Sequence, residues 1–162
     1  MWQKFKPYLL IFSVAIAIPL AVGILSALFT RGNMNIYEEI NRPPLSPPGM
    51  LFPIVWSVLY VLMGVSSGLV YLNRERNPEK AAEGLRYYAA SLILNFGWSI
   101  IFFNLGSFFF AFIWLIALLY TIIRTILCYR QVSPVAAYLQ IPYALWVCFA
   151  GYLNFAIWLL NG

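Results

Sequence analysis

The sequence predicts an all-α integral membrane protein, a five-transmembrane-helix bundle that forms one domain over residues 1–162. Of these 162 residues, 63% are hydrophobic and only 9% are charged, whereas a soluble domain usually carries about 25% charged residues. The five acidic residues all lie between the long apolar runs. A soluble fold could not bury so much apolar surface, so we expect the lipid bilayer to be the solvent of this chain.

Five segments are apolar enough, over about 20 residues, to cross a bilayer as helices. The first follows a basic flank like a secretory signal, but it is too long and no small-residue cleavage site follows it. Prolines inside the first and last segments, Pro19 and Pro142, are expected to bend their helices, because each removes a backbone hydrogen bond. The expected helices cover residues 8–29, 50–73, 84–104, 108–129 and 134–160.

The boundary between the third and fourth helices comes from a turn signal. The uncharged run 87–123 is too long for one span, and the residues Asn104 to Ser107, with sequence N-L-G-S, divide it. In the second helix, Gly64 and Gly68 form a GxxxG pair. We expect this pair to serve helix packing within the bundle more than dimerisation.

The loop over residues 30–49 is expected to be stiff, and its length fits a lid over a binding site. Asn35 and Glu38 are spaced like an N-cap and its partner, which predicts a short surface helix over 36–40. Long loops in compact proteins are often lids or binding loops. A rigid connector into the second helix is an equally good interpretation of the composition. Four prolines force extended backbone in the second half of the loop: Pro43, Pro44, Pro47 and Pro48.

Basic residues predict the orientation, because short cytoplasmic loops are enriched in Lys and Arg. With the N-terminus in the cytoplasm and the C-terminus outside, eight basic residues lie inside and two, Arg31 and Arg42, lie outside. We expect Arg124, near the end of the fourth helix, to snorkel to the interface. The eight inner residues are Lys4, Lys6, Arg74, Arg76, Lys80, Arg86, Arg124 and Arg130.

Composition also excludes several kinds of site. The chain has no histidine and no aspartate, so we expect no metal site and no haem ligated through histidine. A carboxylate within the membrane, which proton-coupled transporters use, is missing as well. Both cysteines, Cys128 and Cys148, lie in apolar runs and are expected to be buried thiols. The basic residues fit membrane orientation better than nucleic-acid binding.

Aromatic and amide side chains recur at helical spacing in the outer halves of three helices. Trp56, Tyr60 and Met63 share one stripe of the second helix, and Asn95, Trp98 and Phe102 share one stripe of the third. On the fifth helix the corresponding stripe contains Pro142, Trp146, Phe149 or Ala150, and Leu153. Asn95 and Asn154 should face inward, because an amide in lipid lacks partners. The stripes fit either core packing or an aromatic cavity for a flat apolar ligand.

Four motifs that follow one another in order resemble a known family. They are P-P-G-M-L-F-P-I-V-W-S-V-L-Y-V-L-M-G from Pro47, L-N-F-G-W-S-I-I-F-F from Leu94, V-S-P-V-A-A from Val132 and P-Y-A-L-W-V-C-F-A-G-Y-L-N from Pro142. In this order they resemble the translocator protein family, also called tryptophan-rich sensory proteins and, in animals, the peripheral benzodiazepine receptor. The compact loops resemble those of the bacterial members, which implies a location in the bacterial cell membrane.

The resemblance implies a five-helix bundle whose pocket opens toward the loop between the first two helices. It implies porphyrin ligands such as protoporphyrin IX, no required cofactor, and homodimers in many members. It also implies two catalytic tryptophans, Trp56 and Trp146, in members that degrade porphyrin in light. The implied ligand-binding residues are Trp56, Tyr60, Asn95, Trp98, Phe149 and Asn154.

The chain departs from the family pattern at several places, two of which bear on the choice of ligand. Leu45 and Met50 stand where the family often has tryptophan, so the rim of the site is less aromatic. Phe155 and Leu159 stand where many animal members have a tyrosine and an arginine proposed to read cholesterol. We therefore do not carry cholesterol recognition over to this chain.

Three functions remain open at this point. The first is a membrane receptor or sensor that binds porphyrins and similar flat apolar ligands. The second is light- and oxygen-dependent porphyrin degradation, which would need the ligand as photosensitiser and indole as electron donor, because no conventional nucleophile or carboxylate pair is present. The third is porphyrin transport, which the lack of an inverted repeat and of a buried carboxylate disfavours.

Overall fold

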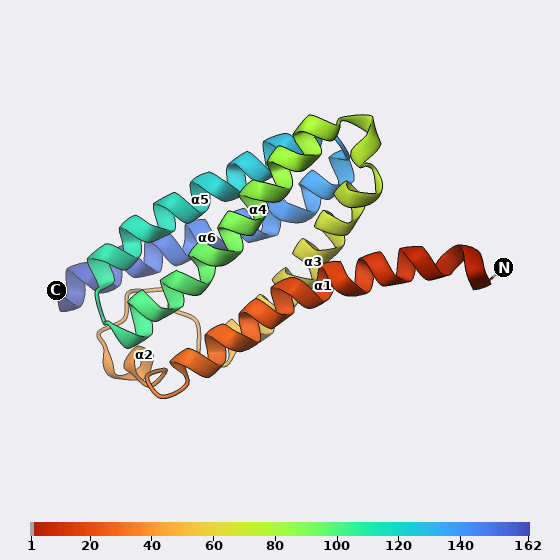
Figure 1. The fold of residues 1–162 in the computed structure, drawn as a ribbon. Helices are drawn as coiled ribbons and strands as arrows, with labels where there is room; N and C mark the ends of the chain where they lie inside the picture. The colour runs from red at the N-terminus through yellow and green to blue at the C-terminus, as the bar shows by residue number, and fades with distance from the viewer. Residues whose placement is uncertain (1) are drawn as a thin grey trace.

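Five long helices dominate the computed structural model, which describes residues 2–162 and the surroundings of side chains from residue 6 onward. Lys4, part of the expected charge asymmetry, has its side chain outside the described residues. Figure 1 shows the long helices running along the molecule, with the two termini at opposite ends. They are α1 (Trp2–Thr30), α3 (Leu51–Leu72), α4 (Pro78–Ser99), α5 (Phe108–Arg130) and α6 (Pro134–Asn161).

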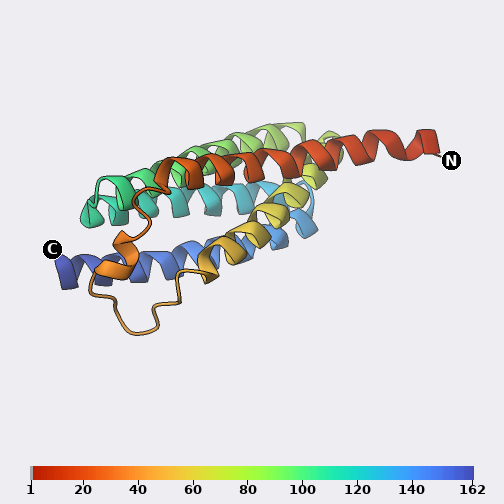
Figure 2. The ribbon, with the colours of Figure 1, turned by 90° about the horizontal axis from the view of Figure 1, so that it is seen from below.

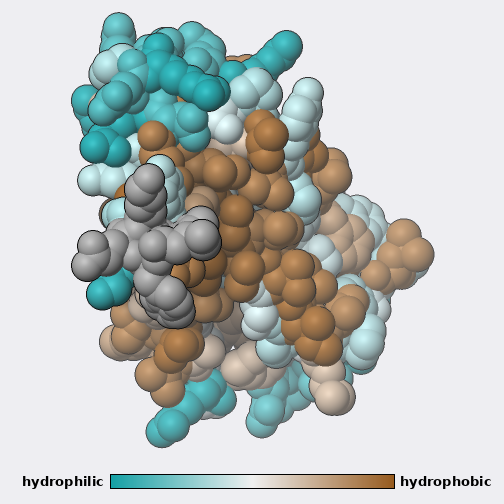
Figure 3. All heavy atoms as spheres, turned by 90° about the vertical axis from the view of Figure 1, so that its right-hand side faces the viewer, coloured by the Kyte–Doolittle hydropathy of each residue, from teal (hydrophilic) through white to brown (hydrophobic). Residues whose placement is uncertain are grey.

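Four of these helices are long and apolar enough to cross a membrane: Lys6–Thr30, Leu51–Leu72, Phe108–Arg130 and Pro134–Asn161. The outward faces carry large apolar side chains, for example Leu10 at 65% exposure and Leu145 at 65%. On the face in Figure 3, apolar groups cover the centre, and hydrophilic groups gather at the top edge, near the α3–α4 turn. The chain is therefore an integral membrane protein built as a helical bundle.

The helix α1 packs mainly on α3 through the two glycines of the GxxxG pair. A Cβ atom added to Gly64 would lie 2.5 Å from the Cα of Ile16 and 2.8 Å from the carbonyl oxygen of Ala15. A Cβ atom added to Gly68 would lie 2.8 Å from the Phe12 ring. The backbones of the two helices therefore touch, and the expected use of this pair in packing within the bundle is confirmed.

The helices α4, α5 and α6 form the other part of the bundle, with α5 packed against both of its neighbours. Gly84 of α4 lies against α5, since a Cβ atom there would come 2.7 Å from the Tyr129 ring. Figure 2 shows α1 and α3 close together over part of their length and diverging toward the loop that joins them. This divergence leaves room for a cavity.

The helix α4 differs from the expected third helix at both ends. It begins at Pro78, six residues before the expected start, because the side chain of Asn77 caps it by accepting a hydrogen bond from the backbone N–H of Lys80 at 3.2 Å. A short 3₁₀ helix, Arg74–Arg76, precedes it, and a π-helical turn, Ile100–Asn104, follows it. The turn then closes at Gly106, whose φ of 59° suits glycine.

The short helix in the loop, α2 (Ile36–Glu39), forms for a reason other than the expected cap. Asn35 is itself helical and its side chain makes no capping hydrogen bond, so that expectation was wrong. Tyr37 is buried instead, and its hydroxyl donates to the carbonyl oxygen of Pro47 at 2.9 Å. The buried tyrosine ties α2 to the proline-rich half of the loop, so α2 is not a free surface helix.

Arg124 forms an ion pair with the neighbouring helix. Its guanidinium donates to Glu83 on α4 at 2.6 Å and lies over the Tyr87 ring, 5.0 Å from its centroid. Glu83 also accepts from Lys80 at 2.6 Å. One carboxylate thus joins α4 to α5 near the turns opposite the lid loop.

The two cysteines have different surroundings. Cys128 is buried between helices, as expected, but Cys148 is exposed on the outer face of α6. The expectation of a buried thiol at Cys148 was wrong, because this side of α6 faces lipid. A helix that is apolar all round gives no sequence signal that separates inward from outward positions.

Substituting the two glycines Gly64 and Gly151 by alanine should have opposite effects. Gly64→Ala should destabilise the protein by about 1–3 kcal/mol, because the new methyl group meets the backbone of α1 and that backbone cannot move aside locally. Gly151→Ala should be neutral or stabilising by up to about 1 kcal/mol, since nothing lies within 4 Å of its Cβ position. Thermal unfolding in detergent would measure both. Equal stability of the two variants would contradict the close α1–α3 contact.

Candidate functional site

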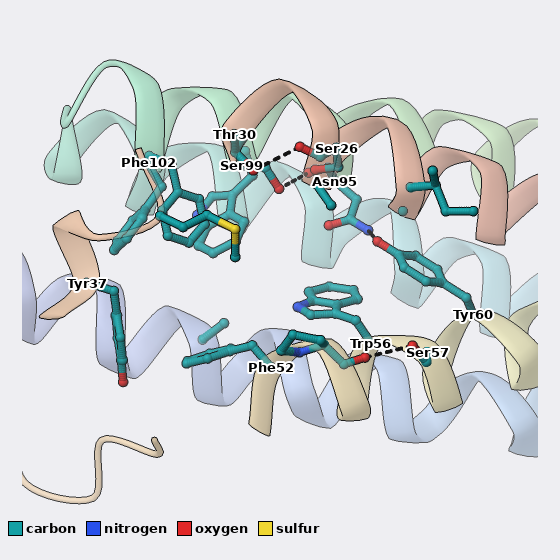
Figure 4. Close-up of a pocket in the computed structure, with 18 of the residues that line it drawn as sticks. Ser26, Thr30, Tyr37, Phe52, Trp56, Ser57, Tyr60, Asn95, Ser99 and Phe102 are labelled. Atoms are coloured by element: carbon teal, nitrogen blue, oxygen red, sulfur yellow. Dashed lines mark hydrogen bonds between the residues drawn. The ribbon is translucent and has the colours of Figure 1, made fainter. Parts of the chain in front are cut away.

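A cavity of about 280 Å³ lies where α1 and α3 diverge. Side chains from α1, α2, α3, α4, the π-helical turn and α6 line it, and all of the lining residues are uncharged. Figure 4 shows aromatic rings on several sides of this space. Its size and mostly apolar lining are typical of a site for a small apolar molecule.

One wall of the cavity is a pair of stacked aromatic rings on α3. The rings of Trp56 and Tyr60 have centroids 5.4 Å apart and an interplanar angle of 28°. In Figure 4 the Trp56 ring lies across the cavity from Asn95. The expected inward stripe of α3 is therefore present, and it offers a flat surface on which a planar ligand could stack.

Asn95 and Tyr60 supply polar groups at the inner end of this wall. The Nδ2 of Asn95 donates to the Tyr60 hydroxyl at 3.1 Å, and Asn95 is only 2% exposed. In Figure 4 the other end of the amide points away from Tyr60. This arrangement leaves the amide oxygen of Asn95 as an acceptor at the cavity.

Asn154 also borders the cavity, but its amide is already used by the protein. Its Oδ1 accepts from the indole N–H of Trp98 at 3.0 Å, and its Nδ2 donates to the carbonyl oxygen of Phe108 at 2.7 Å. The side chain thus joins α4, α5 and α6. It shapes the cavity through Trp98 rather than by offering a free polar group.

Two expected site residues do not line this cavity. Trp146 and Phe149 contact each other, with ring centroids 5.6 Å apart, and Trp146 packs edge-on against Phe52 at 5.8 Å. Phe52 stands between Trp146 and the cavity. On α6 the lining face instead contains Ala150, so the structure decides between the two alternatives that spacing left open.

The part that α1 and α2 play in lining the cavity was not predicted from the sequence. Gly23 lies directly against the Tyr60 ring, where a Cβ atom would clash with the ring, and Ala27 lines the cavity. The small-residue pair on α1 was a usable signal, but it indicated close helix contact and not a cavity wall. Tyr37 and Met34 close the lid end.

Asparagines hold the lid loop at two places along its length. Asn33 donates to Asn104 at 3.0 Å, and Asn104 in turn donates to the carbonyl oxygen of Phe29 at 3.1 Å. At the end of α6, the side chain of Asn161 accepts a hydrogen bond from the backbone N–H of Asn41 and donates one to its carbonyl oxygen, at 2.9 Å each. These contacts attach the loop to the α4–α5 turn and to α6.

Leu45 introduces strain into the same loop. It has a φ of 69°, a conformation that a leucine adopts only at some cost, and its side chain is 81% exposed. Tyr152 donates to the neighbouring carbonyl oxygen of Pro44 at 2.9 Å. The loop is therefore fixed in place on both sides of its strained residue.

The cavity also reaches the lipid-facing surface between α1 and α3. Ile24 on α1 lines it and is 61% exposed, and Ser57 on α3 lines it and is also exposed. The hydroxyl of Ser57 donates to the carbonyl oxygen of Pro53 at 2.7 Å, so it needs no other partner in lipid. This side opening gives an apolar molecule a second way into the cavity besides the lid.

Within the part of the chain that the structure describes, no three His, Cys, Asp or Glu side chains come together as a metal site would require. The cavity lining also lacks any such side chain. Chemistry in this cavity would depend on aromatic rings and amides.

Comparison with known proteins gives one consistent result. The model of the TspO/MBR family matches residues 15–159. The chain is 35% identical over 154 residues to the Tryptophan-rich protein TspO of Chlorobaculum tepidum, covering 94% of this chain and 97% of the relative. It is 33% identical over 153 residues to the Protein CrtK of Rhodobacter capsulatus, covering 94% of each. It is 33% identical over 142 residues to the Translocator protein of Bos taurus, covering 87% and 84%.

Asn154 and Trp98 should be energetically coupled. Asn154→Leu should destabilise the protein by about 1–3 kcal/mol, because it leaves the partly buried indole N–H of Trp98 without its acceptor. Trp98→Phe should also be destabilising. The double variant should lose less unfolding free energy than the two single variants lose together. Chemical unfolding in detergent would measure the cycle. Strict additivity would show that this hydrogen bond does not hold the helices together.

Proposed function

The chain belongs to the TspO/MBR family, and from this premise we propose that it is a membrane receptor that binds porphyrins, such as protoporphyrin IX, and similar flat apolar ligands. Family membership by itself supports a membrane sensor or receptor role. The cavity between α1 and α3 is the proposed binding site. The ligand itself is the part of the proposal that requires experiment.

The observation that carries the proposal is the uncharged, aromatic cavity wall made by Trp56 and Tyr60. A planar macrocycle could stack on this wall, with the amide of Asn95 at the inner end. The carboxylates of a porphyrin would stay at the lid end, where Arg42 lies 5.1 Å from the centroid of the Tyr37 ring. This orientation keeps the charged groups near water and the ring in the apolar space.

The same proposal includes the arrangement in the membrane. We place α4 across the bilayer as a fifth span, because it packs along α5 and exposes Ile93 at 70% on its outer face. The N-terminus is then cytoplasmic, and the lid loop and C-terminus lie outside, as the distribution of basic residues favours. In this orientation the Glu83–Arg124 pair lies toward the cytoplasmic surface.

Photo-oxidative degradation of a bound porphyrin is the second candidate, and the Trp56–Tyr60 stack favours it. An excited porphyrin on Trp56 would be next to an indole that can donate an electron. Trp146 lies behind Phe52 and outside the cavity, so we assign the direct role to Trp56 and only a remote role to Trp146. A product that forms only with light and oxygen, and not with Trp56→Phe, would support this activity. Bleaching at the rate of free porphyrin would exclude it.

Titration of the purified protein with protoporphyrin IX tests the binding proposal. Trp56→Phe should raise Kd about tenfold, because a smaller ring stacks less area on the ligand. Trp146→Phe is the matched control and should change Kd less than twofold, since its ring lies outside the cavity. Binding would be followed in darkness by porphyrin absorbance as well as by tryptophan fluorescence, because each variant removes one fluorophore. If the wild type fails to bind, the proposal is wrong; equal affinity of all three proteins would move the site elsewhere.

The opening between α1 and α3 predicts that ligand dissolved in the bilayer enters sideways. Ser57→Trp should slow association from porphyrin-loaded vesicles about tenfold, because the larger side chain narrows the opening. Val58→Trp, on the neighbouring lipid-facing position that does not line the cavity, is the control and should leave the rate unchanged. Stopped-flow fluorescence would measure both. Unchanged kinetics in Ser57→Trp would leave the lid as the entrance.

A further inference from the structure

A second group of polar side chains lies beneath the cavity, inside the bundle. Four of their atoms are buried and have no hydrogen-bond partner among the described residues: the hydroxyls of Tyr88, Tyr129 and Tyr143 and the Oε1 of Gln140. Exposure of these residues is 6%, 0%, 1% and 1% respectively. They come from α4, α5 and α6, so three helices bring unpartnered polar groups into the interior.

Two of the three tyrosines are neighbours. The rings of Tyr88 and Tyr129 have centroids 6.4 Å apart. The Tyr143 hydroxyl lies beside Ser91 and the Tyr88 hydroxyl lies beside Ser67. The cluster therefore contains further hydroxyls that can still accept.

Gln140 extends the cluster toward α3. Its Nε2 donates to the hydroxyl of Ser66 at 3.1 Å, and that hydroxyl donates to the carbonyl oxygen of Ala136 at 2.7 Å. The amide is thereby held in one orientation, with its Oε1 unpartnered. The Oε1 of Gln140 is therefore a fixed acceptor, and none of the described side chains donates to it.

The cluster also borders the cavity described above. The Tyr143 ring packs edge-on against Trp56, with centroids 6.1 Å apart. Trp56 in turn stacks on Tyr60, so Tyr143 lies close to the aromatic wall of the cavity. Tyr60 accepts a hydrogen bond from Asn95, so its own proton is free to go toward the cluster.

In a bilayer, such groups cannot turn to bulk water, and a buried hydroxyl without a partner is strongly unfavourable. Phenylalanine would avoid this cost at the same volume, and the chain uses phenylalanine 13 times elsewhere. Proteins commonly satisfy buried polar groups with bound water, which makes about three hydrogen bonds at such sites. The cluster offers both donors and acceptors, as water requires.

We propose that Tyr88, Tyr129, Tyr143 and Gln140 form an internal water-binding site beneath the cavity, between α4, α5 and α6. Its waters bridge the three phenols to the amide oxygen and give the Tyr60 hydroxyl an acceptor. The site extends the hydrogen-bonding groups of the cavity floor into the inner half of the bundle without any carboxylate. It does not depend on which ligand the cavity binds.

Tyrosine-to-phenylalanine variants of the full-length protein in nanodiscs test this site. Tyr129→Phe and Tyr143→Phe should each lower Tm by about 2–4 °C, because each removes a bridged hydroxyl. The double variant Tyr88→Phe with Tyr129→Phe should lower Tm by less than the sum of the two single variants, since the two phenols share water. Tyr138→Phe, at a position 68% exposed, is the control and should leave Tm unchanged. An unchanged or higher Tm in the buried variants would overturn the proposal.

A second measurement on the unmodified protein needs no variant to fold. X-ray-generated hydroxyl radicals label side chains next to bound water even where bulk solvent is excluded. After correction for intrinsic reactivity, Tyr129 and Tyr143 should be labelled well above the equally buried Leu118 and Ile122. Labelling of the two tyrosines no greater than that of these apolar residues would show that the cluster is dry and would overturn the site.

Discussion

The close contact between α1 and α3 at Gly64 determines the shape of the rest of the molecule. Because Gly64 has no side chain, the backbone of α3 rests on the backbone of α1 at Ala15 and Ile16. Beyond this contact the helices diverge, and the space between them becomes the cavity. A bulkier residue at the contact would displace α1 and with it one whole cavity wall, so a single backbone approach controls the geometry of a site that begins about one turn away.

The bilayer imposes a second constraint, because polar groups inside it must find partners within the protein. Most asparagines of the bundle satisfy this by joining elements: Asn154 links three helices, and Asn161 and Asn104 hold the lid loop. Asn95 is different, since one end of its amide bonds Tyr60 and the other borders the cavity. The distinction between a structural and a ligand-facing amide thus depends on whether a second protein partner is within reach. The same reasoning makes the unpartnered phenols below the cavity informative.

Much of the architecture could be predicted from the sequence. Apolar runs predicted a helical membrane protein, the Asn104–Ser107 turn separated two helices, and the four motifs predicted the family that the comparisons then established. The stripe of Trp56 and Tyr60 was predicted to face inward, and it does. The predictions for the Asn35 cap and for Cys148 were wrong, because both depended on local spacing where a buried tyrosine or the direction of the lipid decided the outcome. Trp146 and Phe149 do not line the cavity, and their part in a ligand site stays a prediction.

The sequence by itself determined the solvent of this protein, its helical class and which residue types face inward, because these follow from apolar content and from a 3.6-residue repeat that acts along one helix at a time. Only the tertiary structure decided which inward residues meet. The opposition of Gly23 and Tyr60, the choice of Ala150 over Phe149 and the ion pair of Arg124 with Glu83 all join helices far apart in the chain. Such meetings depend on helix rotation and on the point of closest approach, and the repeat of a single helix carries no information about either.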